Sequence, residues 1–236
     1  MATADDDIDL LFRMRPRRGR ISGDPTNVFG QGGNFIPRRR KDSSPAVRSL
    51  RGKTTPGSDI DLVTGGRKNK KSFVRFEARP VRSGNVRSEL AVGPLTDFDQ
   101  PTEITTRFRA DALDPITGTA YLLQIWQPVI SPIAGLRVQG GRLEATTRSG
   151  GTAWSTRFRE GKWYNFRIEF QAGDDGFFRI YGGKSGRLLG EVEGRIDGGS
   201  QAGRARQDSW RPKLGFYGSS GNSLNVDYSD FSFGLG

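Results

Sequence analysis

Short runs in which apolar and polar residues alternate recur from residue 73 to the C-terminus, and no segment has convincing helical periodicity. In the clearest run, 163–171, one face of an extended strand would carry Tyr164, Phe166, Ile168 and Phe170. The other face would carry Asn165, Arg167 and Glu169, so one side of this strand is expected to be buried and the other solvated. About a dozen such runs, separated by Gly, Pro, Asn and Asp, predict an all-β, two-sheet antiparallel jelly-roll sandwich, with a closed barrel as the alternative.

The N-terminal third has a different composition. Residues 1–71 hold 16 basic and 8 acidic side chains, out of 37 and 26 in the whole chain. Their apolar residues are too sparse to offset the chain entropy that folding would remove. We therefore predict an extended, mostly irregular basic N-terminal arm at 1–71 and a jelly-roll β-sandwich domain at 72–236.

The arm combines small apolar clusters with arginine clusters, as expected for a segment that becomes ordered on a partner. We predict that it fastens the chain to other protein subunits of a large assembly, including copies of itself. The expected contact residues are Phe12, Phe29, Phe35, Arg38, Arg39 and Arg40. A solvated tail and a nucleic-acid-binding arm are the alternatives, although no stacking aromatics accompany the charge.

Cysteine and histidine are both absent from the chain. Their absence excludes disulfides, Cys/His zinc sites, cysteine nucleophiles, Ser-His-Asp triads and histidine general bases. We expect no cofactor and no metal site. No run of about 18 apolar residues occurs, and the N-terminus is acidic where a secretion signal would be basic. These features favour assembly in the cytoplasm, without secretion and without a membrane partner.

Three short segments carry a resemblance to a known family. They are Arg87-Ser88-Glu89-Leu90, Gln124-Ile125-Trp126 and Lys213-Leu214-Gly215-Phe216-Tyr217. In this order they resemble the R-(S/T)-E-L, Q-I-H and K-A-G-x-Y strands of the jelly-roll polysaccharide lyases of the alginate-lyase and heparin-lyase-like type. That family has a concanavalin-like sandwich, and the likeness covers residues 72–236 and none of the arm.

The resemblance implies a glycan-binding site on a concave sheet face. Its members would be Arg87, Gln124, Trp126, Lys213 and Tyr217. In such lyases the arginine and the glutamine neutralise the uronate carboxylate and the tyrosine acts as acid or base. The family's catalytic histidine is absent, because Trp126 stands at its position and offers a flat surface on which a sugar ring could stack. Alternatively, Arg87 and Glu89 form an ordinary surface pair, and Trp126 and Tyr217 are core aromatics.

Taken together, these features favour a non-catalytic structural or binding protein with no catalytic residues. In this interpretation a lectin-like jelly roll is held by its arm in a bacteriophage virion, as a capsid decoration or tail protein. The alternative is a polysaccharide lyase acting on an acidic glycan, with Tyr217, Arg87 and Gln124 as the catalytic residues. A nucleic-acid binder that uses the arginine-rich arm is the second alternative.

Overall fold

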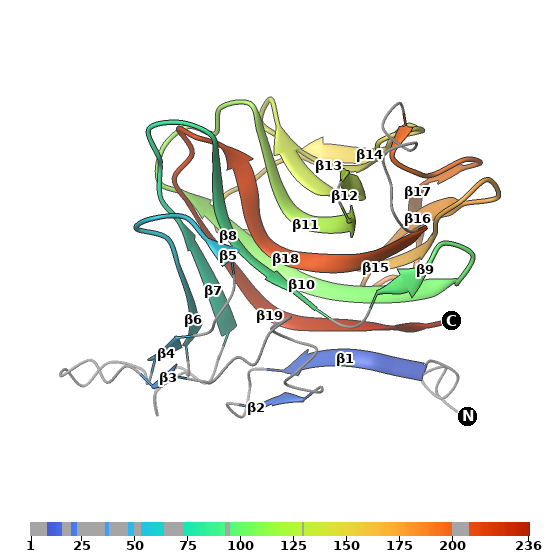
Figure 1. Ribbon diagram of the computed structural model, residues 1–236, viewed down its shortest axis with the longest axis horizontal. Coiled ribbons are helices and arrows are strands. Elements are labelled where there is room, and N and C mark those ends of the chain that lie inside the picture. Colours follow the sequence, from blue (N-terminus) through green and yellow to red (C-terminus); the bar gives the residue numbers. More distant parts are fainter. Residues whose placement is uncertain are drawn as a thin grey trace.

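The computed structural model describes residues 9–15, 20–22, 36–37, 47–49, 53–63, 73–92, 95–128, 130–199 and 208–236. Within these ranges the chain forms strands and turns but no α-helix, and the strands make two antiparallel sheets that form a sandwich (Figure 1). The predicted fold class, an all-β two-sheet sandwich, is confirmed. In the described part of the chain, nothing has the length and apolar character of a membrane-spanning helix.

The larger sheet has eleven strands in these ranges. They are β1 (Asp9–Arg15), β2 (Arg20–Ser22), β3 (Ile36–Pro37), β4 (Val47–Ser49), β6 (Asp59–Val63), β7 (Phe73–Ala78), β10 (Thr102–Ala112), β15 (Tyr164–Gln171), β16 (Phe177–Gly182), β17 (Leu188–Glu193) and β19 (Leu224–Leu235). Their order is β17-β16-β15-β10-β19-β7-β6-β4-β3, with β1 beside β19 and β2 beside β1.

The smaller sheet has eight strands in the same ranges. They are β5 (Lys53–Thr54), β8 (Asn85–Ala91), β9 (Thr96–Asp97), β11 (Thr119–Gln127), β12 (Ser131–Gln139), β13 (Arg142–Thr147), β14 (Gly151–Arg157) and β18 (Ser209–Ser219). Their order is β14-β13-β12-β11-β18-β8-β5, and β9 pairs with one end of β18. This order makes β8, β18 and β11 neighbours, although they are far apart in the sequence.

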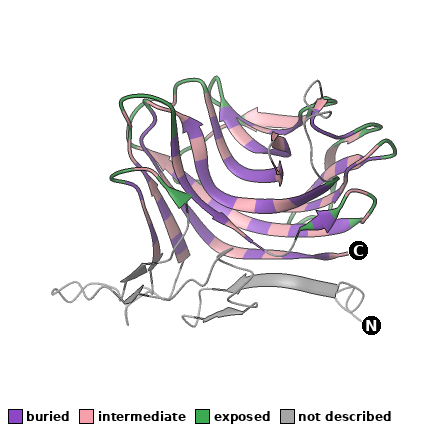
Figure 2. Cartoon of the chain, in the orientation of Figure 1, coloured by how far each residue is buried: buried purple, intermediate pink, exposed green. Residues whose placement is uncertain are grey.

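Alternation along the strands fixes which side chains enter the core, and Figure 2 shows it as stripes of buried and less buried residues. Strand β15 alternates strictly between buried and half-buried positions, as its sequence predicts. Its neighbour β10 does the same from Thr102 to Ala110. Strands β15 and β16 pair antiparallel as a hairpin.

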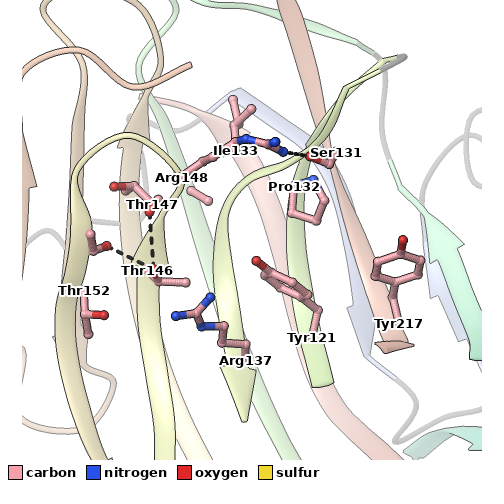
Figure 3. Close-up of a pocket in the computed structure, with 12 residues that line it drawn as sticks. Tyr121, Ser131, Pro132, Ile133, Arg137, Thr146, Thr147, Arg148, Thr152 and Tyr217 are labelled. Atoms are coloured by element: carbon pink, nitrogen blue, oxygen red, sulfur yellow. Dashed lines mark hydrogen bonds between the residues drawn. The ribbon is translucent and has the colours of Figure 1, made fainter. Parts of the chain in front are cut away.

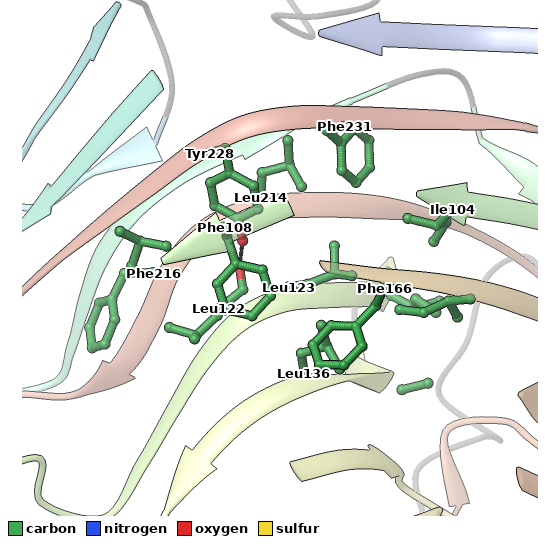
Figure 4. Close-up of a cluster of buried hydrophobic side chains, with 14 of the residues drawn as sticks. Ile104, Phe108, Leu122, Leu123, Leu136, Phe166, Leu214, Phe216, Tyr228 and Phe231 are labelled. Carbon is green, nitrogen blue, oxygen red and sulfur yellow. Dashed lines mark hydrogen bonds between the residues drawn. The ribbon is translucent and has the colours of Figure 1, made fainter. Parts of the chain in front are cut away.

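The core between the sheets is rich in aromatic rings. Figure 4 shows Phe108, Phe166 and Tyr228 of the larger sheet in one cluster with Leu122 and Leu136 of the smaller sheet. The Tyr228 hydroxyl is fully buried and donates a hydrogen bond to the carbonyl oxygen of Leu122. A buried phenol needs such a partner, and this bond ties the two sheets together at the centre of the core.

Phe166→Ala is expected to lower the free energy of unfolding by about 3–5 kcal/mol, because it leaves a cavity among Trp154, Phe108 and Tyr164. Arg167→Ala, on the outer face of the same strand, should lower it by less than about 1 kcal/mol, because its ion pairs with Glu103 and Glu169 are partly exposed. Chemical denaturation measures both values. Equal losses would contradict the register of β15.

A β-bulge in β11 changes which residues face outward. The pairing of β11 with both β12 and β18 shifts between Tyr121 and Leu123, and Leu122 and Leu123 are both fully buried. An extra residue in a strand reverses the alternation beyond it. Consequently Tyr121 and Gln124, three positions apart, both lie on the face that points away from the core.

Part of the predicted arm contributes to the sheets. Strands β5 and β6 lie at 53–63 and pair with β8 and β7, and Ile60 is fully buried in the core. The sheets therefore begin earlier in the sequence than residue 72. Phe12 lies on β1, which pairs with the C-terminal half of β19.

Other arm residues lie outside the described residues, namely Phe29, Phe35, Arg38, Arg39 and Arg40. The role of the arm in assembly or in nucleic-acid binding stays a prediction.

Candidate functional site

The three sequence motifs meet on one face of the smaller sheet, the face that points away from the core, here called the open face. In the strand register, Tyr217 of β18 lies between Arg87 of β8 and Tyr121 of β11. Lys213, four residues earlier on β18, is paired with Gln124. The structure thus brings together Arg87, Gln124, Lys213 and Tyr217 from three separate parts of the sequence.

Glu89 is the polar centre of this face. Its side chain is only 2 % exposed, and its carboxylate accepts a hydrogen bond of 2.9 Å from Nε2 of Gln124. Nζ of Lys213 lies 3.4 Å and a guanidinium nitrogen of Arg87 lies 3.5 Å from its other oxygen. Arg87 and Glu89 are therefore not an ordinary surface pair, because a buried carboxylate with three donors fixes the positions of all three side chains.

Sequence reasoning missed Glu89 as a member of the site. The signal was its position two residues after Arg87, which puts both side chains on one face of a strand. Its burial could not be predicted, because the three donors that cover it come from β8, β11 and β18.

Trp126 lies beside two cations. Nζ of Lys213 is 4.0 Å from the centre of its ring, and the guanidinium carbon of Arg211 is 5.8 Å from it. Trp126 is half-buried on the open face, so it is not a core aromatic. Since Lys213 already contacts its ring, a sugar would meet a tryptophan that is part of a cation–π contact.

The lysine is held in an unusual environment. Its side chain is 12 % exposed. Burial lowers the pKa of Lys213 below that of an ordinary lysine, and the nearby Arg87 and Lys53 act in the same direction, while Glu89 opposes them. The neutral amine of Lys213 is thus easier to form than that of a free lysine side chain.

Tyr217 is also half-buried on the open face rather than in the core. The guanidinium of Arg87 lies over its ring, 4.9 Å from the centre, and Asn85 donates a hydrogen bond of 2.8 Å to its hydroxyl. These two contacts fix the ring and leave the hydroxyl able to donate its own proton.

A cleft of about 550 Å³ continues the site across the sheet. Figure 3 shows Tyr121 and Tyr217 next to each other at one side of it, with Arg137 beyond Tyr121. The lining residues are Tyr121, Ser131, Pro132, Ile133, Ala134, Arg137, Thr146, Thr147, Arg148, Gly151, Thr152 and Tyr217. Apart from Tyr217, the sequence reasoning missed these residues, because they become neighbours only through the pairing of β11 to β14.

Positive charge dominates this face. Arg137 is paired with Glu144 at 3.0 Å, whereas the described residues supply no ion-pair partner for Arg211. The buried Nε of Arg211 also has no hydrogen-bond partner there. Burial lowers the pKa of Arg211. A face with several cations, one of which has no ion-pair partner among the described residues, and with hydroxyl-lined space suits a polyanionic, polyhydroxylated ligand.

Comparison with known proteins identifies the fold. No family model matches the chain, and no curated protein matches it. The endo-beta-1,4-glucuronan lyase from the fungus Trichoderma reesei is 14% identical, with a TM-score of 0.58 over 87% of this chain and 96% of that one. The alginate lyase from Corynebacterium sp. is 15% identical, with a TM-score of 0.54 over 86% and 92% of the two chains.

The same fold is also present in the receptor binding domain of botulinum neurotoxin type G. It is 10% identical, with a TM-score of 0.50 over 96% of this chain and 47% of that one. At such identities the similarity establishes a jelly-roll sandwich of the kind found in polysaccharide lyases, and nothing more about activity.

The prediction of a non-catalytic virion component is wrong. The solved structures that share this fold are mostly polysaccharide lyases, which favours the alternative of a lyase instead. The error has a simple cause: a basic arm joined to a jelly roll is a general arrangement, and neither charge nor fold class specifies what the sandwich does.

Proposed function

We propose that this protein is a polysaccharide lyase that cleaves an acidic, uronate-containing glycan by β-elimination on the open face. The observation that supports the proposal is the meeting of Arg87, Gln124 and Tyr217 on three adjacent strands around the buried Glu89. A surface patch without a chemical role would not need a buried carboxylate to hold its cations in fixed positions.

Arg87 and Gln124 would bind the uronate carboxylate. Arg87 has five N–H donors, and its contact with Glu89 at 3.5 Å engages only one guanidinium nitrogen, which leaves donors for a ligand. Gln124 uses one amide hydrogen for Glu89 and retains a second. Two donors on the carboxylate stabilise the negative charge that builds up there when C5 loses its proton.

Tyr217 would protonate the departing oxygen. As the C4–O4 bond breaks, its electron pair moves to the glycosidic oxygen, which takes the phenolic proton of Tyr217. A C4–C5 double bond forms on the uronate, and the other half of the glycan leaves with a free hydroxyl. The remaining phenolate is stabilised by the guanidinium of Arg87 over its ring and by the amide of Asn85.

Incubating the purified protein with glucuronan, alginate and a heparin-like chain tests this function, with cellulose as a neutral control. We expect ultraviolet absorbance from unsaturated uronates with at least one acidic polymer and none with cellulose. A protein that binds these polymers but generates no unsaturated ends would contradict the proposal.

A further inference from the structure

β-Elimination needs a group that accepts the proton from C5 of the uronate, and no histidine exists in this chain for that step. The inference rests on the proposed function and concerns this acceptor. We propose that the amine of Lys213 is the general base, working beside Trp126, the residue that replaces the expected imidazole.

Strand β18 places the amine of Lys213 and the phenol of Tyr217 on either side of Gly215. Lys213 and Tyr217 lie on the same strand face, with Gly215 between them. Four residues of extended strand separate their Cα atoms by about 13 Å, enough for a pyranose ring in contact with a side chain on each side. Gly215 lies across from Glu89 of β8 in the strand register, so the Glu89 carboxylate belongs to the same stretch of the open face.

The surroundings of Lys213 allow it to be neutral. Its Nζ contacts Glu89 and the ring of Trp126, both of which favour the ammonium form. Burial favours the neutral amine and has the larger effect on the pKa of Lys213. The nearby cations Arg87 and Lys53 act in the same direction as burial. A bound uronate excludes more water from the same space, while its carboxylate occupies Arg87.

Other groups on this face suit the step less well. Glu89 is buried beneath its donors, two of which would have to move before it could reach a substrate. The arginines retain their protons at any ordinary pH. Tyr217 serves as the acid that protonates the leaving oxygen. Lys213 is the remaining titratable side chain in contact with the Glu89 centre.

The proton balance is complete. The unshared electron pair of the Lys213 amine takes the C5 proton, and the C–H electron pair moves into the carboxylate-stabilised carbanion. That pair then forms the C4–C5 double bond as O4 departs with the proton of Tyr217. The cycle closes when Lys213 loses a proton to solvent and Tyr217 regains one.

Two substitutions test the assignment. Lys213→Arg keeps a cation of similar length that cannot deprotonate, so kcat should fall by about 10³-fold while KM stays within about threefold. Lys213→Ala should lower kcat by a similar factor. Added primary amines should restore part of the lost rate, and more basic amines should restore more of it. Lys184→Arg, on an exposed turn, is the matched control and should retain the wild-type rate.

The pH profile separates a base from a structural residue. In the wild type, kcat/KM should rise with pH through the lowered pKa of Lys213, because only the neutral amine accepts a proton. In Lys213→Ala with an added amine, this rise should follow the pKa of the amine instead. Melting curves show whether each variant folds. If Lys213→Ala does not fold, Lys213→Arg alone tests the assignment.

Two outcomes overturn the inference in different ways. If the wild type generates unsaturated product and Lys213→Arg retains most of the rate, Tyr217 or another group is the base and only the assignment of Lys213 fails. If the wild type generates no unsaturated product from any uronate polymer, the proposed function fails, and the assignment of the base fails with it.

Discussion

Tyr217→Phe is expected to lower kcat on a uronate polymer by about 10³-fold, within the range of 10²–10⁴ that a positioned general acid contributes. Only the phenolic hydroxyl is removed, so the ring remains available to stack under the guanidinium of Arg87. KM should change little, because binding of the uronate carboxylate depends on Arg87 and Gln124. Steady-state assays of unsaturated product measure both constants.

Tyr181→Phe is the matched control for this substitution. Its hydroxyl donates to Glu169 on the outer face of the larger sheet, away from the open face. The control should retain the wild-type rate and melt at nearly the same temperature. A Tyr217→Phe protein as active as this control would remove Tyr217 from the reaction.

Gly215→Ala is expected to lower the free energy of unfolding by about 4 kcal/mol, or to prevent folding altogether. A Cβ atom at this position would lie 2.1 Å from the carbonyl oxygen of Ser88 and 2.4 Å from the ring of Phe76. The backbone also has φ of +108°, which L residues rarely adopt. Backbone strain and overpacking of the core therefore add up.

Gly140→Ala separates these two causes. Gly140 has φ of +55° and nothing within 4 Å of a Cβ atom, so the substitution should lower stability by only about 1 kcal/mol. Chemical denaturation of both variants gives the comparison. If Gly215→Ala is no worse than Gly140→Ala, the close approach of β18 to β8 and to the core is wrong.

The sequence contains enough information to predict the sandwich. Strict alternation in 164–171 identifies both faces of β15, because a strand with one wet face has a period of two. The placement of Arg87 and Tyr217 on an outward face follows from the same rule.

Two features of the site do not follow from alternation. The bulge at Leu122 and Leu123 shows in the sequence only as consecutive apolar residues, which fit a fully buried strand equally well. Arg137 and Arg148 join the cleft because β11 to β14 pair in order, a result of long-range contacts that short motifs do not encode. The incorrect prediction of a virion component has a similar cause, because the charge of the arm says nothing about the chemistry of the open face.

The most direct test of the lyase assignment is the mass of the products from a glucuronate oligosaccharide of defined length. Elimination adds no water, so the masses of the two fragments should sum to the mass of the substrate, and proton NMR should show a vinyl proton on the new non-reducing end. Fragments that together exceed the substrate by one water, with no vinyl signal, would identify hydrolysis and contradict the account. An intact oligosaccharide, under conditions in which the protein binds it, would contradict it as well.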